Sequence, residues 1–254
     1  MLIGFLVAHL AASGRTEARI ASNLVANSVA QAAADGAIFE AIFNLSDPRP
    51  AQRWPVDGTA RAIAIGNSRV RVQLEDEAWR INPSRASPTL LEALLQVTGS
   101  DPESARRLAI AIDEWVGMGT VPGPQNALVA KYQAAGLDYA PPGEPIESLD
   151  ELGRVLGMTP AILTAIRPHL TLFGPSEPNP GTSDPIVAAA LALTAQAGQA
   201  APVANQAPSP QLTVRITALA SGPANAQVIR SAIVRTGAAL PRGYVVLAWG
   251  NGFN

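Results

Sequence analysis

The feature that most constrains this chain is an unbroken helical pattern over its first 45 residues. No proline occurs between Met1 and Leu45, and apolar residues recur at the three- and four-residue spacing of one helix face. The segment 46–48 ends the pattern with a proline, which cannot continue the hydrogen-bond ladder of a helix. We predict a single helix from about Ile3 to Leu45. Four of its apolar side chains should be partly covered by a sheet: Ile20, Leu24, Ile38 and Ile42.

The first twelve residues are apolar apart from His9, and three interpretations of them are open. A signal peptide would need basic residues before the apolar run and a cleavage site, and neither is evident. A buried core segment is a second possibility. The third is the rear half of a membrane helix, since the run is shorter than the about 20 apolar residues that span a bilayer. We favour the third because the helical pattern continues far beyond the run.

Strand patterns flank a long helical block. Apolar and polar residues alternate before the block over 61–65 and 69–74, and strand-forming segments follow it at 212–216, 227–234 and 244–249. The block itself is punctuated by proline and glycine, and a linker rich in alanine, glutamine and proline follows it. We therefore predict an α+β fold in which the long helix packs on one antiparallel sheet and a helical domain is inserted between its strands. The segments are 1–81 for the helix and first strands, 82–198 for the insertion, and 199–254 for the linker and last strands.

The helical block contains a weak internal repeat. The spacing of leucine, valine, glycine and proline over 91–102 recurs over 149–160, which predicts two units of helix, glycine turn and proline-started helix. Such hairpins can bind nucleic-acid phosphates through backbone N–H groups. The turns 98–102 and 156–160 carry no lysine or arginine, so we interpret them as packing hairpins. A membrane-anchored helix-hairpin-helix DNA-binding protein remains the alternative.

Residue types that support catalysis are scarce. The chain has no cysteine and two histidines, His9 and His169, and no phosphate-binding or zinc-binding motif occurs. The acidic pairs at 76–77, 113–114 and 150–151 are isolated, which is typical of solvated surface or helix caps. A net charge of −2 gives no electrostatic argument for binding an anionic polymer. We predict no catalytic or cofactor-binding residues and no enzyme activity.

Three stretches together resemble one family, the type II secretion system minor pseudopilins of protein K type: 14–42, 76–82 and 148–171. The resemblance implies a pilin-like fold with an inserted helical domain, and a structural role at the tip of the pseudopilus. It also implies the other minor pseudopilins I and J as partners, with no nucleic acid and no small-molecule substrate. The implied location is the inner membrane, with the main domain in the periplasm.

The chain departs from the family pattern at a metal loop. The family typically has an acid-rich metal loop after the helix that ends at Trp115, and only Glu114 of the usual acids is present here. Calcium takes six to eight oxygen ligands, several of them carboxylates. We therefore predict that the family's calcium site is lost and that the protein has no metal or other cofactor.

Partner contacts are expected along the long helix, where small side chains would let another helix approach closely. The residues that we expect at this interface are Ala21, Leu24, Ala30 and Ala34.

Overall fold

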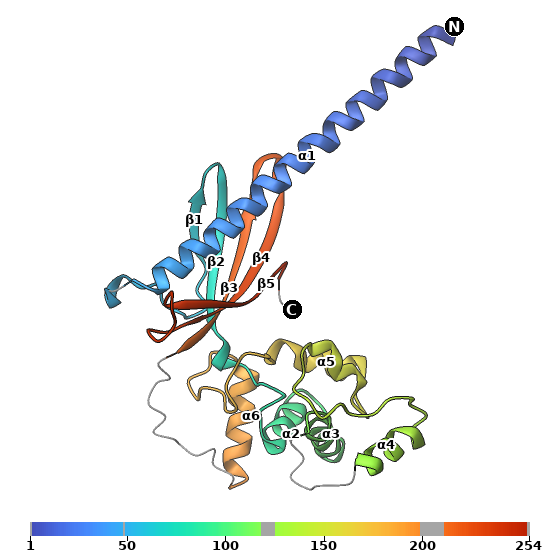
Figure 1. Ribbon diagram of the computed structural model, residues 1–254, viewed down its shortest axis with the longest axis vertical. Coiled ribbons are helices and arrows are strands. Elements are labelled where there is room, and N and C mark those ends of the chain that lie inside the picture. The colour runs from blue at the N-terminus through green and yellow to red at the C-terminus, as the bar shows by residue number, and fades with distance from the viewer. Residues whose placement is uncertain (1, 48, 118–124, 199–210, 253–254) are drawn as a thin grey trace. The chain divides into compact units, whose positions relative to one another are not determined.

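The computed structural model describes residues 2–47, 49–117, 125–198 and 211–252, and it contains two compact units (Figure 1). The first, here called the helix–sheet unit, comprises Met1–Asp76 and Pro210–Phe253. The second, the helical unit, comprises Glu77–Ser209. The chain therefore leaves the first unit after one part of its sheet, builds the second unit, and returns to finish the first.

Helix α1 (Leu2–Leu45) is one continuous helix, which confirms the prediction from the proline-free pattern. It packs on strands of the sheet through a face made mostly of alanine, so that backbone and sheet approach closely. The buried residues of this face recur every three or four positions: Ala30, Ala33, Ala34, Ala37, Ile38, Ala41, Ile42 and Leu45. In the residues that the structure describes, no helix is both long enough and apolar enough to cross a membrane.

The expected covering of four apolar side chains of α1 is half right. Ile38 and Ile42 are buried, but Ile20 and Leu24 are 55% and 62% exposed. Each exposed residue lies 18 positions before a buried one, which is five turns of an α-helix, so all four point to the same side. The first buried residue of the described side chains is Ala26, and α1 extends past the strands toward its N-terminus (Figure 1). The period identified the correct side of the helix but not how far the sheet reaches along it.

Five strands form one antiparallel sheet in chain order, which confirms the predicted pairing across the insertion. The strands are β1 (Arg61–Ile65), β2 (Ser68–Asp76), β3 (Leu212–Ser221), β4 (Gln227–Thr236) and β5 (Tyr244–Gly250). In β2 the side chains alternate: Val70, Val72 and Leu74 are buried toward α1, while Arg69 and Arg71 are exposed. The turn from β1 to β2 is two residues long, and its first residue, Gly66, has a φ of 56°.

The helical unit begins most of its helices in the same way. Its elements are η2 (Glu77–Trp79), α2 (Pro88–Val97), α3 (Pro102–Trp115), α4 (Gln125–Ala134), η3 (Leu149–Arg154), α5 (Pro160–Ile166), η4 (Arg167–His169) and α6 (Pro185–Gln196). Four of these helices have proline as the first residue and a side-chain cap just before it. The capping residues are Ser87, Asp101, Thr159 and Asp184. Proline needs no hydrogen-bond acceptor there, and the cap supplies one for the next N–H groups.

The first copy of the internal repeat forms the two predicted α-helices, whereas the second forms a 3₁₀ helix followed by an α-helix. Helices α2 and α3 are joined at Gly99, which has a φ of 105°. In the second copy α5 follows Gly157, with a φ of 90°, but the segment before it is the short 3₁₀ helix η3, not an α-helix. The segment contains Gly153, which disfavours a longer helix, and Val155 is already extended where η3 ends.

Candidate functional site

The most prominent surface feature is apolar and lies on α1. Of the twelve exposed large apolar side chains in the described residues, half belong to this helix: Ile20, Leu24, Val25, Val29, Phe39 and Phe43. Scattered exposed apolar residues are normal, but a concentration on one element marks an interaction surface. Two parts of this surface adjoin each other and share Ala21, Ser22 and Val25.

The first part is the overhang, defined here as residues 17–25, all of whose side chains are exposed. Ile20 and Leu24 continue the face that packs on the sheet farther along the helix, as the spacing of 18 residues requires. The overhang therefore presents a face of core type with none of its own sheet beneath it. A neighbouring helix or sheet edge of apolar character could cover it.

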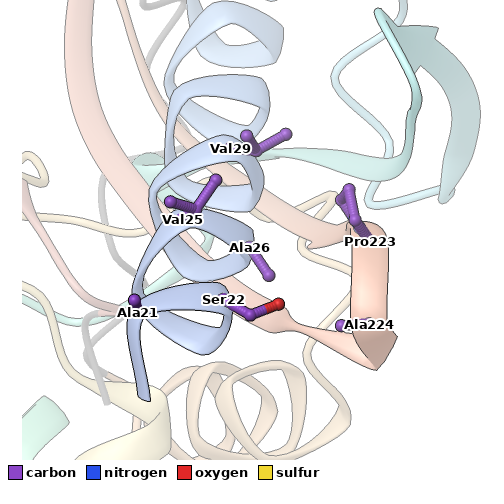
Figure 2. Close-up of a pocket in the computed structure, with 7 residues that line it drawn as sticks. All are labelled: Ala21, Ser22, Val25, Ala26, Val29, Pro223 and Ala224. Carbon is purple, nitrogen blue, oxygen red and sulfur yellow. The ribbon is translucent and has the colours of Figure 1, made fainter. Parts of the chain in front are cut away.

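The second part is a shallow groove between α1 and the loop that joins β3 to β4. Its volume is about 340 Å³, and Figure 2 shows the residues that line it: Ala21, Ser22, Val25, Ala26, Val29, Pro223 and Ala224. The lining carries one hydroxyl group and no charge, which suits contact with apolar side chains and gives a polar substrate no anchor. Ala224 has a φ of 51°, a conformation that alanine rarely adopts.

The loop beside the groove is fixed against the helix. The N–H of Gly222 donates to the carbonyl of Ala226 at 2.9 Å, and the N–H of Ala226 donates to the carbonyl of Pro223 at 3.0 Å. A Cβ atom at Gly222 would lie 3.0 Å from the Cβ of Ala30, so glycine allows this close approach. The wall of the groove is thus held by contacts within the helix–sheet unit.

The four residues expected to contact partner helices are divided by the structure between two environments. Ala21 and Leu24 are exposed on the overhang. Ala30 and Ala34 are fully buried in the core between α1 and the sheet, so they present no surface to a partner while this fold is intact. Small residues allow close packing against a partner helix or against a sheet, and here Ala30 and Ala34 pack against the protein's own sheet.

Sequence reasoning missed the far side of α1. Val25 and Phe43 are also 18 residues apart and are 64% and 72% exposed, so they share a second side of the helix. Phe39 lies there too, with its ring centroid 5.3 Å from that of Trp249 on β5. The signal available in the sequence was the number of apolar residues, which exceeds what one sheet-facing stripe requires.

The segment 76–82, which carries a family resemblance, has a structural role in the helical unit. Asn82 is 3% exposed, and its Nδ2 donates to the carbonyls of Leu172 at 3.2 Å and Gly174 at 3.0 Å. Its Oδ1 accepts the N–H of Ser84 at 3.0 Å. The Ile81 N–H donates to the carbonyl of His169, and the Ile81 carbonyl accepts the N–H of Thr171, both at 2.9 Å.

Further contacts close the same region, here called the neck and defined as residues 77–82 with 168–182. The hydroxyl of Thr171 donates to the fully buried Glu77 carboxylate, which also lies 3.5 Å from Nη1 of Arg80. A Cβ atom at Gly174 would lie 3.0 Å from the Glu77 carbonyl oxygen, so the backbones of these two segments are in close contact. The motif therefore joins the start of the helical unit to its segment 168–182.

Several titratable side chains in the helical unit form ion pairs or cap helices. His169 Nδ1 lies 2.6 Å from Oδ2 of Asp184, and the other oxygen of Asp184 caps α6. Asp150 pairs with Arg167, and Glu151 completes a capping box on η3. Among the described residues, no group of three or more histidine, aspartate or glutamate side chains could hold a metal ion. The helix N-termini beside the glycine turns are capped by Asp101 and Thr159 of the chain itself.

An aromatic cluster lies beside the last turn of α3. Tyr132 is fully buried, and its ring lies near those of Trp115 and Tyr139, at centroid distances of 6.2 Å and 5.9 Å. Its hydroxyl accepts the N–H of Leu156 at 3.1 Å. Burial raises the pKa of the Tyr132 hydroxyl above its usual value, and the nearby Glu114 carboxylate raises it further.

Comparisons with known proteins agree with this arrangement. Residues 70–175, which run from β2 through most of the helical unit, match the family model described as Type II secretion system (T2SS), protein K. A chain in the crystal structure of the GspK-GspI-GspJ complex from the enterotoxigenic Escherichia coli type 2 secretion system has a similar fold, with a TM-score of 0.57 and 15% sequence identity. The alignment covers 95% of the present chain and 100% of the other. No curated protein matches the sequence. The segment 70–175 is therefore identified as a domain of the type II secretion system protein K family.

Proposed function

We propose that this protein is a minor pseudopilin, a structural subunit at the tip of the type II secretion pseudopilus. The observation that carries the proposal is the uncovered apolar overhang of α1, in a chain whose residues 70–175 match the protein K family model. A helix face of core type without a sheet beneath it is a feature of a subunit that packs on others.

The partners that we propose are the I and J minor pseudopilins of the same secretion system. The structurally similar chain comes from a complex with GspI and GspJ, and the present chain aligns over nearly all of its own length. The proposed contact is through the overhang and the groove beside it. Burying a leucine or isoleucine side chain contributes about 1.5–3 kcal/mol, and Ile20 and Leu24 still have more than half of their area to bury.

The helical unit supports placement at the end of a filament. This unit is inserted between β2 and β3, so each copy of this protein carries an extra domain on a pilin-like framework. A filament subunit that must accept another above it has little room for such an insertion, whereas a terminal subunit has no such neighbour. The role is one of assembly, and we propose that the protein has no catalytic turnover.

The location that we propose is the inner membrane, with the main part of the protein in the periplasm. Its support is the apolar run of the first twelve residues, which we interpret as part of a membrane anchor.

The partner proposal is tested with the full chain in mild detergent, mixed with its cognate I and J proteins and separated by size-exclusion chromatography. The three should co-elute, and Leu24→Asp should weaken binding at least about tenfold because it places a charge in an apolar interface. Ile110→Asp is the matched control, since Ile110 is a 42% exposed apolar residue of the helical unit. Its complex should be unchanged.

Failure of all three proteins to associate at concentrations of about tens of micromolar would overturn the partner proposal. Normal binding by Leu24→Asp would be consistent with I and J as partners but would show that the overhang is not the contact surface.

A further inference from the structure

Helix α4 is attached to the helical unit by few side chains. Of its described side chains, 127–134, only Tyr132 is buried and only Leu128 is half-buried, while the others are exposed. Tyr132 inserts into the aromatic cluster beside α3. A ten-residue helix of this kind is too short to be stable alone in water. Its position must therefore depend on the few contacts that it makes.

The second contact of α4 is an ion pair. Lys131 Nζ lies 2.7 Å from Oε2 of Glu114, which is in the last turn of α3. Lys131 is the only lysine in the chain, where every other basic side chain apart from the two histidines is arginine. The Glu114 side chain is 24% exposed, so it is only partly able to find water in place of the ammonium group.

A calcium ion does not fit at this place. The protein K resemblance implies an acid-rich metal loop after Trp115, but the sequence has no aspartate or glutamate between Glu114 and Asp138. Of the two carboxylates at the end of α3, Asp113 is buried and Glu114 is already bound to Lys131. Calcium needs six to eight oxygen ligands with several carboxylates among them, and a bound ammonium group repels a divalent cation.

We propose that Lys131 is an internal cation that docks α4 on the end of α3, in the role that a divalent metal would otherwise serve. The ammonium group neutralises Glu114 from within the chain, and it is part of the same helix as the anchoring Tyr132. The attachment is consequently independent of calcium and sensitive to salt, because a partly exposed ion pair is screened by mobile ions. This proposal concerns the helical unit and does not depend on the proposed partners.

The test is hydrogen–deuterium exchange of the α4 backbone in the full chain, followed by mass spectrometry. Lys131→Met should speed exchange in α4 about three- to tenfold, since it removes the pair and leaves Glu114 without a partner. Lys131→Arg should keep at least half of this protection because it keeps the positive charge. Arg107→Met is the matched control, as it removes an exposed ion pair with Glu103 on α3 itself. Exchange in α4 should be unchanged in that variant.

Calcium provides the second arm of the test. Exchange of the wild-type α4 should be the same in about 1 mM CaCl₂ and in a chelator. Slower exchange with calcium would overturn the proposal, since the metal would then have a place that Lys131 does not fill. Wild-type exchange rates in Lys131→Met, or equal rates in the Arg and Met variants, would overturn it as well.

Discussion

Replacing Asn82 by alanine should unfold the helical unit at much lower denaturant concentration. The amide of Asn82 is nearly inaccessible to water and has three hydrogen bonds, two to carbonyls of the segment 172–174 and one from the Ser84 N–H. Alanine leaves these three backbone groups without their partner. A buried group that loses its partner costs about 1–3 kcal/mol, and some of the three will recover a water molecule. We therefore expect a loss of about 2–4 kcal/mol.

The measurement is pulsed hydrogen exchange along a urea series, because it reports the two units separately. With a urea dependence of about 2 kcal/mol per molar, the midpoint of α2 and α6 should fall by about 1–2 M. The midpoint of the sheet should be unchanged. Gln133→Ala is a control for loss of an amide group, since Gln133 is exposed. A shift below about 0.3 M for Asn82→Ala would refute the structural role that we assign to the neck.

Three further predictions concern packing and pH. Ala34→Leu should destabilise the helix–sheet unit by about 1–3 kcal/mol in calorimetry, because Ala34 is fully buried between α1 and the sheet and a larger side chain would overpack the core. The raised pKa of Tyr132 means that the folded state holds this proton more tightly, so stability should fall as pH rises above about 10. The melting temperature of Tyr132→Phe should fall less steeply between about pH 9.5 and 11. Burial raises the pKa of Glu177, so its ionisation opposes folding above about pH 4.5, and Glu177→Gln should melt higher than wild type at neutral pH but not at about pH 4. Unchanged melting curves in any of these variants would contradict the corresponding contact.

The long helix and the sheet could be predicted because each rests on a period that is visible in the sequence. Helical spacing identified the side of α1 that carries Ile38 and Ile42, and alternation identified β2. A period does not say where the neighbouring element stops, which is why Ile20 and Leu24 were expected to be covered. The spacing of five full turns made them look equivalent to residues that a sheet does cover.

The interface and the neck were harder for a different reason. Alanine at positions 30 and 34 fits both a helix partner and a tightly packed sheet, and only the fold shows that the sheet is the occupant. The amide of Asn82 bonds to residues about ninety positions away along the chain, and no local pattern carries that information. Likewise, Lys131 and Glu114 lie 17 residues apart on different helices, so no spacing within one helix predicts their pairing.

The central claim, that this protein is a structural subunit of type II secretion, is tested most directly by deleting its gene and measuring export. Substrates of the secretion system should then be retained by the cells, and the wild-type gene should restore their release into the medium. Leu24→Asp should fail to restore it at an equal protein level, whereas Ile110→Asp should succeed. Undiminished export by the deletion strain would contradict the account.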